Sequence, residues 1–194
     1  MPWPDDVTLE GRHATLRLLS PDDAPALVEA VKDGELWRLW YTFVPKPEDM
    51  DKEIARRLDL REKGSMLPFA VLDAGGAPVG MTTYMNIDAE AKRVEIGSTW
   101  YRAAAQRTPV NTECKRMLLA HAFEALGCIA VEFRTNFFNH SSRRAIERLG
   151  AKLDGILRSH QLNRDGTLRD TAVYSIIASE WPTVRTHLDF QLER

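Results

Sequence analysis

The spacing of apolar and polar residues along the first half of the chain predicts one strand, two helices and then three more strands. The first strand covers 15–19 (TLRLL), and the serine, proline and two aspartates that follow it mark the start of a helix that Gly34 ends. A second helix is predicted over 48–63, where apolar residues recur every four positions. Three apolar segments separated by turns then predict an antiparallel meander: 67–72, 79–87 and 93–101.

The second half of the chain alternates between helical and extended patterns. An amphipathic helix is predicted to begin at Asn111 or Thr112, which are both strong capping residues, and to end at Gly127. Alternating apolar positions predict a half-buried strand over 129–134. The remaining predicted elements are a helix over 139–149, a hairpin of strands over 152–164 and 168–178, and a closing helix capped by Ser179. This order predicts one α/β (α+β) domain over 1–194, with a mixed, largely antiparallel sheet flanked by helices.

Composition narrows the class of protein. The chain has 194 residues, of which 44% are hydrophobic and 28% charged, enough for one well-buried domain. Acidic and basic residues are mixed and the net charge is −2, so neither nucleic acid nor a membrane surface is an expected partner. The N-terminus resembles no signal peptide and no segment is apolar enough to span a bilayer, so a cytoplasmic location is expected. Cys114 and Cys128 lack metal-ligand spacing, and we expect reduced thiols and no metal site.

A polar loop between the strand that ends at Tyr101 and the central helix is the first candidate for chemistry. A loop that joins a strand to a helix directs free backbone N–H groups and the positive end of the helix dipole at one place. Such a place suits a phosphate or pyrophosphate. An ordinary strand-to-helix connection is the alternative, and this stretch alone favours that alternative slightly.

Three motifs, in this order along the chain, favour the anion site over an ordinary connection: EIG at 95–97, QRTPVNT at 106–112 and NHSSRRAIERLGA at 139–151. With the order of elements, they resemble the GCN5-related N-acetyltransferase (GNAT) superfamily and, within it, the RimJ/RimL-like branch. The resemblance extends from Ala14 to about Trp181. It implies acetyl-CoA as cosubstrate, without a metal, held where two neighbouring strands splay apart. It also makes a homodimer plausible, with the closing hairpin as its interface.

The resemblance implies a set of residues that bind the coenzyme, from the end of the third meander strand, the polar loop and the NHSS segment: Thr99, Trp100, Tyr101, Gln106, Arg107, Thr108, Val110, Asn111, Thr112, Asn139, Ser142 and Arg143. One departure concerns the loop, because Pro109 stands where the family has glycine. Proline has no N–H, so one potential phosphate donor is missing. Arg143, Arg144 and Arg148 are candidates for the ribose phosphate, or they only solvate their helix.

Two residues are candidates for catalysis. Glu95 is the proposed general base, acting through water, and its alternative is a solvated strand glutamate paired with Arg93 or Lys92. The tyrosine that many relatives use to protonate the thiolate is absent, because Ile146 lies near its place. Ser142 is therefore the candidate proton donor, with helix capping as its alternative. For Asn139, the alternative to coenzyme binding is the role of a turn residue.

The function that this resemblance implies is an acetyl-CoA-dependent N-acetyltransferase. It would transfer acetyl directly to a primary amine of a protein N-terminus, a peptide or a small molecule. A non-catalytic acyl-CoA-binding or regulatory module is the alternative, and a purely structural interaction domain is a third hypothesis. The acceptor wall is expected from the aromatic segment 36–47 and the closing hairpin, and its aromatic residues would suit an apolar or cationic acceptor.

Overall fold

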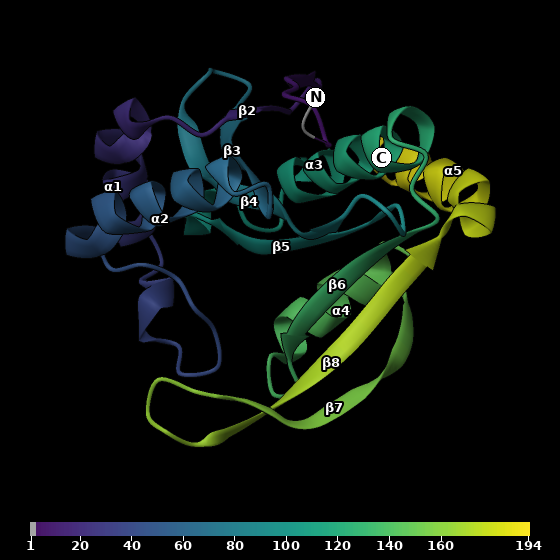
Figure 1. Ribbon diagram of the computed structural model, residues 1–194. Coiled ribbons are helices and arrows are strands. Elements are labelled where there is room, and N and C mark those ends of the chain that lie inside the picture. The colour runs from purple at the N-terminus through teal and green to yellow at the C-terminus, as the bar shows by residue number, and fades with distance from the viewer. Residues whose placement is uncertain (1–2) are drawn as a thin grey trace.

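An eight-stranded sheet forms the centre of the protein, in a computed structural model that describes residues 3–194 (Figure 1). Neighbouring strands are antiparallel except for one parallel pair, β5 with β6. Across the sheet, the strands follow one another in this order: β1 (Leu9–Glu10), β2 (Ala14–Leu18), β3 (Met66–Asp73), β4 (Pro78–Asp88), β5 (Arg93–Tyr101), β6 (Ala130–Asn136), β8 (Leu168–Ile177) and β7 (Lys152–Leu162). The predicted mixed, largely antiparallel sheet is therefore confirmed.

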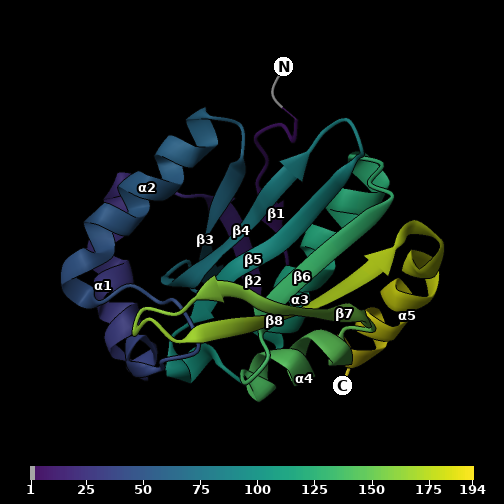
Figure 2. The same ribbon diagram turned by 60° about the horizontal axis from the view of Figure 1, so that its bottom comes forward.

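Helices cover both faces of this sheet (Figures 1 and 2). Alternation along β4 separates two apolar clusters, because Met81 packs with residues of α1 and α2 while Tyr84 packs with residues of α3. We refer to the two sides as the α1/α2 face and the α3 face. The helices are α1 (Ala24–Lys32), α2 (Met50–Glu62), α3 (Pro109–Ala120), α4 (His140–Arg148) and α5 (Trp181–Leu192).

The predicted order of elements is confirmed, with differences at element ends. The short strand β1 was not predicted. Helix α3 begins at Pro109 rather than at Asn111 or Thr112, because the Thr108 hydroxyl caps it by accepting from the Val110 N–H at 3.4 Å. The prediction that Ser179 caps the closing helix is wrong: residues 178–180 form a 3-10 turn, in which the Glu180 carboxylate accepts from the Ile177 N–H at 3.2 Å.

Strands β5 and β6 pair over only three residues and then separate (Figure 1). The last pair joins Glu95 to Glu132, and β5 continues to Tyr101 with β4 as its only strand partner within residues 3–194. Its other edge therefore presents backbone N–H and C=O groups without a strand partner. This confirms the splayed strand pair that the resemblance implied.

A β-bulge lies in the unpaired part of β5. Met81 pairs with Trp100 and Thr83 with Gly97, so β5 has one more residue than β4 between these pairs. Ser98 takes up the difference with a φ of 48°. Beyond the bulge, Thr99 lies on the α3 face and Trp100 on the α1/α2 face, the reverse of what strict alternation from Ile96 would give.

The carboxylate of Glu113 fastens α3 to the start of β2. It accepts hydrogen bonds from the backbone N–H groups of Arg12, His13 and Ala14 at 2.9, 2.6 and 2.8 Å. These donors lie where the chain enters β2 from the turn after β1. The contact fixes the lateral position of α3, whose first turn contributes to the candidate site.

Candidate active site

The polar loop after β5 leads directly into the first turn of α3. Gln106 Nε2 donates to the Tyr101 carbonyl at 3.0 Å, and the Thr108 hydroxyl donates to the Ala105 carbonyl at 2.7 Å. The first N–H groups of a helix have no partner within it, and here these belong to Val110, which donates to the Thr108 hydroxyl, and to Asn111 and Thr112. Pro109 occupies the first helical position, where a missing N–H costs the helix nothing. The loop therefore keeps the form of an anion site with one donor fewer.

The start of α4 lies across the gap between β5 and β6 from this loop (Figure 1). Asn139 caps α4, since its Oδ1 accepts from the Ser142 N–H at 3.0 Å. The alternative role of Ser142 as the cap is therefore wrong, and the turn role of Asn139 is observed. The Ser142 hydroxyl is half-buried and has no hydrogen bond among residues 3–194. Its contact with a thiol, and that of Asn139 with coenzyme, stay predictions.

The arginines of α4 are engaged with protein groups to different degrees. Arg143 Nε donates to the Tyr174 hydroxyl at 2.9 Å, and its guanidinium lies 4.8 Å from the centre of the Phe137 ring. Arg148 donates to the Thr112 hydroxyl at 3.0 Å. Arg144 is exposed. If Arg143 also contacts a phosphate, its guanidinium has to bind that phosphate together with the Tyr174 hydroxyl and the Phe137 ring. The phosphate contact stays a prediction.

A buried lysine that the sequence analysis did not single out contacts the splayed part of β5. Lys115, on α3, is 6% exposed, and its Nζ donates to the hydroxyls of Thr99 at 2.8 Å and Thr82 at 3.1 Å. Burial lowers the pKa of Lys115 to about 8, with Cys114 acting in the opposite direction. The sequence did indicate that Lys115 is buried, because it lies on the same helical face as the apolar residues Leu118 and Leu119.

The side chains of Trp100 and Tyr101 are both buried in apolar surroundings, Trp100 on the α1/α2 face and Tyr101 on the α3 face. Their contribution to a coenzyme site is therefore limited to backbone groups of the unpaired edge. Cys114 is fully buried, and burial raises the pKa of its thiol to about 12. A thiol with that pKa is not a nucleophile at neutral pH.

Glu95 lies on the α1/α2 face, at the last paired position before β5 and β6 separate. It is 5% exposed, accepts from Asn86 Nδ2 at 2.7 Å and lies 3.6 Å from Arg134 Nε. The alternative of a solvated glutamate paired with Arg93 or Lys92 is therefore wrong. Arg93 instead pairs with Glu132 at 2.5 Å.

Burial raises the pKa of Glu95, and the hydrogen bond from Asn86 and the charge of Arg134 act against the rise. A carboxyl with a raised pKa is a stronger base than an ordinary one once it is ionised. A cavity of about 190 Å³ adjoins it, lined by Asn86, Asp88, Arg93, Val94, Glu95, Glu132 and Arg134. Asn86 and Arg134 were not predicted, because no sequence motif relates them to Glu95.

The aromatic segment after α1 meets the β7–β8 hairpin and the start of α4 (Figure 2). The Trp40 and Phe138 ring centres are 5.7 Å apart, and the Arg164 guanidinium lies 4.0 Å from the centre of the Phe43 ring. Segments from three parts of the chain thus border the same region on the α1/α2 side. Their role as an acceptor wall stays a prediction, and one cation already occupies a face of Phe43.

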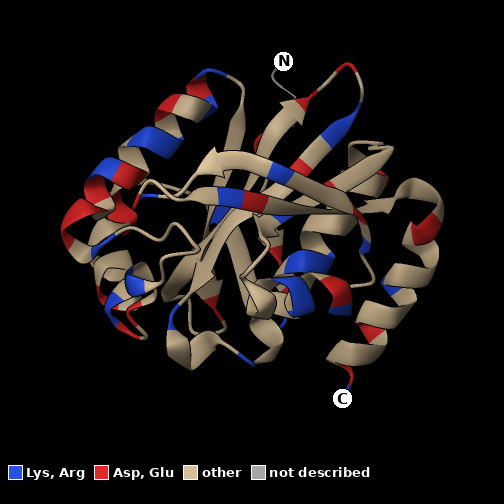
Figure 3. Cartoon of the chain, turned by 90° about the horizontal axis from the view of Figure 1, so that it is seen from below, with Lys and Arg blue, Asp and Glu red and all other residues tan. Residues whose placement is uncertain are grey.

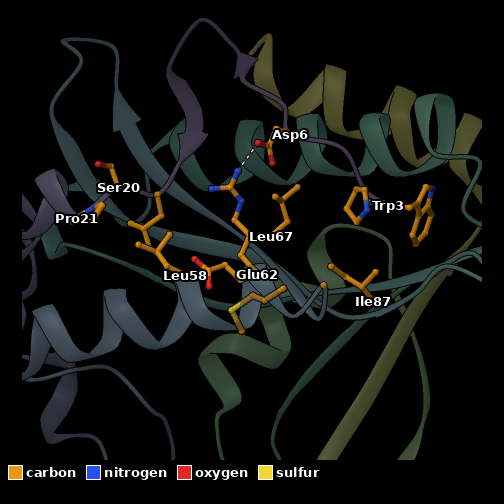
Figure 4. A pocket seen from close by; sticks show the side chains of 13 residues that line it. Trp3, Asp6, Ser20, Pro21, Leu58, Glu62, Leu67 and Ile87 are labelled. Atoms are coloured by element: carbon orange, nitrogen blue, oxygen red, sulfur yellow. Dashed lines mark hydrogen bonds and ion pairs between the residues drawn. The ribbon is translucent and has the colours of Figure 1, made fainter. Parts of the chain in front are cut away.

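A larger cavity, of about 620 Å³, lies elsewhere (Figure 4). It is bordered by the N-terminal segment, the end of α2 and strands β3 and β4, and the ion pair of Arg61 with Asp6 crosses it. None of the predicted site residues lines it. Within residues 3–194, no helix is long and apolar enough to cross a membrane, and no group of three or more His, Cys, Asp or Glu side chains could hold a metal ion.

Comparison with known proteins agrees with this geometry. Residues 13–152 match the family described as acetyltransferase (GNAT) domain. The chain is 29% identical over 175 residues to the Bacillus subtilis (strain 168) protein named "Putative ribosomal N-acetyltransferase YdaF", covering 87% of this chain and 93% of that protein.

Two solved structures extend the comparison. A GCN5-related N-acetyltransferase from Brucella melitensis superposes with a TM-score of 0.88 at 32% identity, covering 98% of this chain and 87% of that one. RimL, a ribosomal L7/L12 alpha-N-protein acetyltransferase in complex with coenzyme A, shares the fold with a TM-score of 0.75 at 17% identity, over 88% of this chain and 98% of that one. The family match spans well over half of this chain, which therefore belongs to the GNAT family of N-acetyltransferases, enzymes that transfer an acetyl group to an amine.

Proposed function

We propose that acetyl-CoA binds along the unpaired edge of β5, with its pyrophosphate at the first turn of α3, and that Glu95 deprotonates the acceptor amine, through a water molecule. The observation that carries this proposal is the order of features along β5. A buried base, an unpaired strand edge and a helix N-terminus follow one another within 95–111. A thioester held on that edge would have the base at one end and the anion site at the other.

The reaction needs few protein groups, because a thioester is already reactive. The neutral amine nitrogen attacks the thioester carbonyl carbon, an amide bond forms, and the C–S bond breaks. The proton of the amine passes to Glu95, and the leaving thiolate takes a proton, for which Ser142 is the proposed donor. N–H groups of the unpaired edge are suited to stabilise the carbonyl oxygen as it gains charge.

The acceptor is proposed to be the amino terminus of a protein or peptide. Two of the similar proteins carry names that describe acetylation of ribosomal proteins, and one of those names specifies the alpha-nitrogen. Small amines are the alternative class of acceptor. A cytoplasmic location, expected from the sequence, and a homodimer, implied by the resemblance, are further proposals. Large apolar side chains are exposed on the proposed interface hairpin: Leu153, Leu157, Leu162 and Leu168. Light scattering would give the molecular mass in solution.

Calorimetric titration with acetyl-CoA, with adenosine bisphosphate as a control ligand, tests the coenzyme site first. Thiol release with a panel of peptides and small amines then tests the transfer. We expect binding of acetyl-CoA and release of thiol that depends on the amine. Binding without transfer to any amine would support the non-catalytic module, which the comparisons do not favour. Absence of binding would overturn the proposed function.

Replacing Pro109 by alanine is expected to tighten acetyl-CoA binding about tenfold, because a hydrogen bond from the restored N–H to a charged phosphate contributes about 1.5 kcal/mol. Pro182 lies in the first turn of α5, far from the candidate site in sequence, so Pro182→Ala is the matched control and should leave the affinity unchanged. Calorimetry measures both. Weaker binding by Pro109→Ala at unchanged melting temperature would show that the pyrophosphate does not lie at this turn.

A further inference from the structure

Arg169 of β8 lies on the same face of the sheet as Glu95. On β6, Phe133 belongs to the core of the α3 face, so Glu132 and Arg134 point to the α1/α2 face, as Glu95 does. On β8, Tyr174 belongs to that same core, and alternation back along the strand places Arg169 on the α1/α2 face. Its charge lowers the pKa of Glu95, and the charge of Glu95 acts on Arg169 in return.

The guanidinium of Arg169 has no protein partner among residues 3–194. Its Nε is buried without a hydrogen bond, and no carboxylate lies within ion-pair distance. Two arginines of this face, Arg93 and Arg134, are neutralised by Glu132, and on the adjoining hairpin Arg158 is paired with Asp170 at 2.6 Å. Partial burial lowers the pKa of Arg169, because the charged guanidinium is less well solvated there than in water.

A second cation without a carboxylate partner lies nearer the tip of the same hairpin. Arg164 stacks on Phe43 and forms no ion pair within the described part of the chain. In Figure 3 the hairpin runs across the view with both blue and red positions along it. The acidic position Asp170 is already paired with Arg158, so the cations left over on the hairpin are Arg164 and Arg169.

We propose that Arg169 binds a carboxylate carried by the acceptor close to the amine that is acetylated. This inference rests on the proposed function, since Glu95 defines where the amine lies. A planar guanidinium matches a carboxylate with two parallel hydrogen bonds, and a partly buried one gains more from such a partner than an exposed one. The preferred acceptor is therefore an amine with a neighbouring carboxylate. That carboxylate can come from an acidic side chain near a peptide N-terminus or from a free acidic amino acid.

Two matched acceptor pairs test the proposal by steady-state thiol release. The peptide amides Ser-Glu-Ala-Ala and Ser-Gln-Ala-Ala form one pair, and free glutamate and glutamine amide, which carries no carboxylate, form the other. We expect the acidic member of one pair to have a KM about tenfold lower, and Arg169→Gln to abolish the difference by raising only that KM, since tenfold corresponds to about 1.4 kcal/mol. The pair that shows the effect identifies the source of the carboxylate.

Arg158→Gln is the control, because Arg158 lies on the same hairpin but is exposed and already paired. It should leave the preference unchanged. An equal loss for acidic and neutral acceptors in Arg169→Gln, or a raised KM for acetyl-CoA, would overturn the proposal and assign Arg169 a structural or coenzyme-binding role.

Binding of both acceptor pairs to the coenzyme A-loaded protein, measured by calorimetry, separates this inference from the proposed function. If the acidic member of either pair binds more tightly to the unchanged protein than to Arg169→Gln, the inference holds even where no thiol is released. Equal binding of the acidic and neutral members of both pairs to both proteins overturns it, even where acetyl transfer is observed. Thermal melting confirms that each variant is folded.

Discussion

Glu95→Gln is expected to lower kcat by about 100- to 1000-fold at neutral pH, with little change in the affinity for acetyl-CoA, because general-base catalysis contributes about that factor. Glutamine has nearly the same shape and can still accept the hydrogen bond from Asn86 Nδ2. The change therefore removes the proton acceptor and little else. Initial rates of thiol release measure kcat, and calorimetry measures the affinity for acetyl-CoA.

The pH profile gives an independent test of the same role. The base acts in its ionised form, so kcat of the unchanged enzyme should rise with pH as Glu95 loses its proton, above the ordinary pKa of a glutamate because burial raises it. Asn86→Ala removes a hydrogen bond that holds this pKa down, and it should move the acidic limb to higher pH. Glu95→Gln should lack this limb.

The stability of the glutamine variant distinguishes a catalytic from a structural role. A carboxyl whose pKa is raised by folding stabilises the native state below its unfolded pKa, and that contribution is lost as the pH rises through the folded value. At neutral pH the ionised, buried Glu95 is therefore a cost, and Glu95→Gln should melt no lower than the unchanged protein. Full activity of the variant at neutral pH would remove Glu95 from the mechanism, and lost activity with a lowered melting temperature would indicate a structural role.

The order of helices and strands could be predicted from the sequence because each element carries its own local pattern. Gly34 and Gly127 end helices, and apolar positions recur with the period of each element. The bulge at Ser98 could not be predicted, because the segment 93–101 is compatible with an unbroken strand. Its effect is to exchange the faces of Thr99 and Trp100, which alternation alone would assign the wrong way round.

Only part of the candidate site could be proposed from the sequence. The loop before α3 was a candidate from its place between a strand and a helix, the resemblance to family motifs added Glu95, and the roles of both stay predictions. The groups that set the properties of Glu95 come from other strands: Asn86 from β4, Arg134 from β6 and Arg169 from β8. Asn86 meets Glu95 through the antiparallel pairing of β4 with β5. Arg134 and Arg169 lie near Glu95 because β5 pairs in parallel with β6 and β6 pairs with β8, and this long-range register leaves no local signal in the sequence.

Arg57→Met is expected to lower the free energy of unfolding by about 3–5 kcal/mol, the usual cost of breaking a buried ion pair by removing one partner. Arg57 is 1% exposed and makes three contacts: Nε with the Glu53 carboxylate at 2.7 Å, and the other nitrogens with the Thr83 hydroxyl at 2.7 Å and the Ser98 carbonyl at 3.0 Å. Methionine fills similar space but leaves the hydroxyl and the carbonyl without their buried donor.

Arg56→Met is the matched control. Arg56 binds the same carboxylate of Glu53 at 2.8 Å, but its side chain is 45% exposed. Exposed ion pairs contribute about 0.2–1 kcal/mol, so the control should lose no more than that. Urea unfolding of both variants gives the free energies. A loss below about 1 kcal/mol for Arg57→Met would mean that water or a rearranged side chain replaces its contacts.

Arg57→Met is expected to affect the candidate site as well as stability, because Arg57 binds the Ser98 carbonyl, which belongs to the bulge that directs the unpaired edge of β5. Without Arg57 this stretch loses the contact that ties it to α2, and the backbone groups proposed to hold the thioester lose their fixed direction. Arg57→Met should therefore also weaken acetyl-CoA binding at temperatures where the protein is fully folded, while Arg56→Met should not. Unchanged coenzyme affinity in a destabilised Arg57→Met protein would show that the bulge keeps its shape without Arg57, and would confine this residue to the packing of α2 on the sheet.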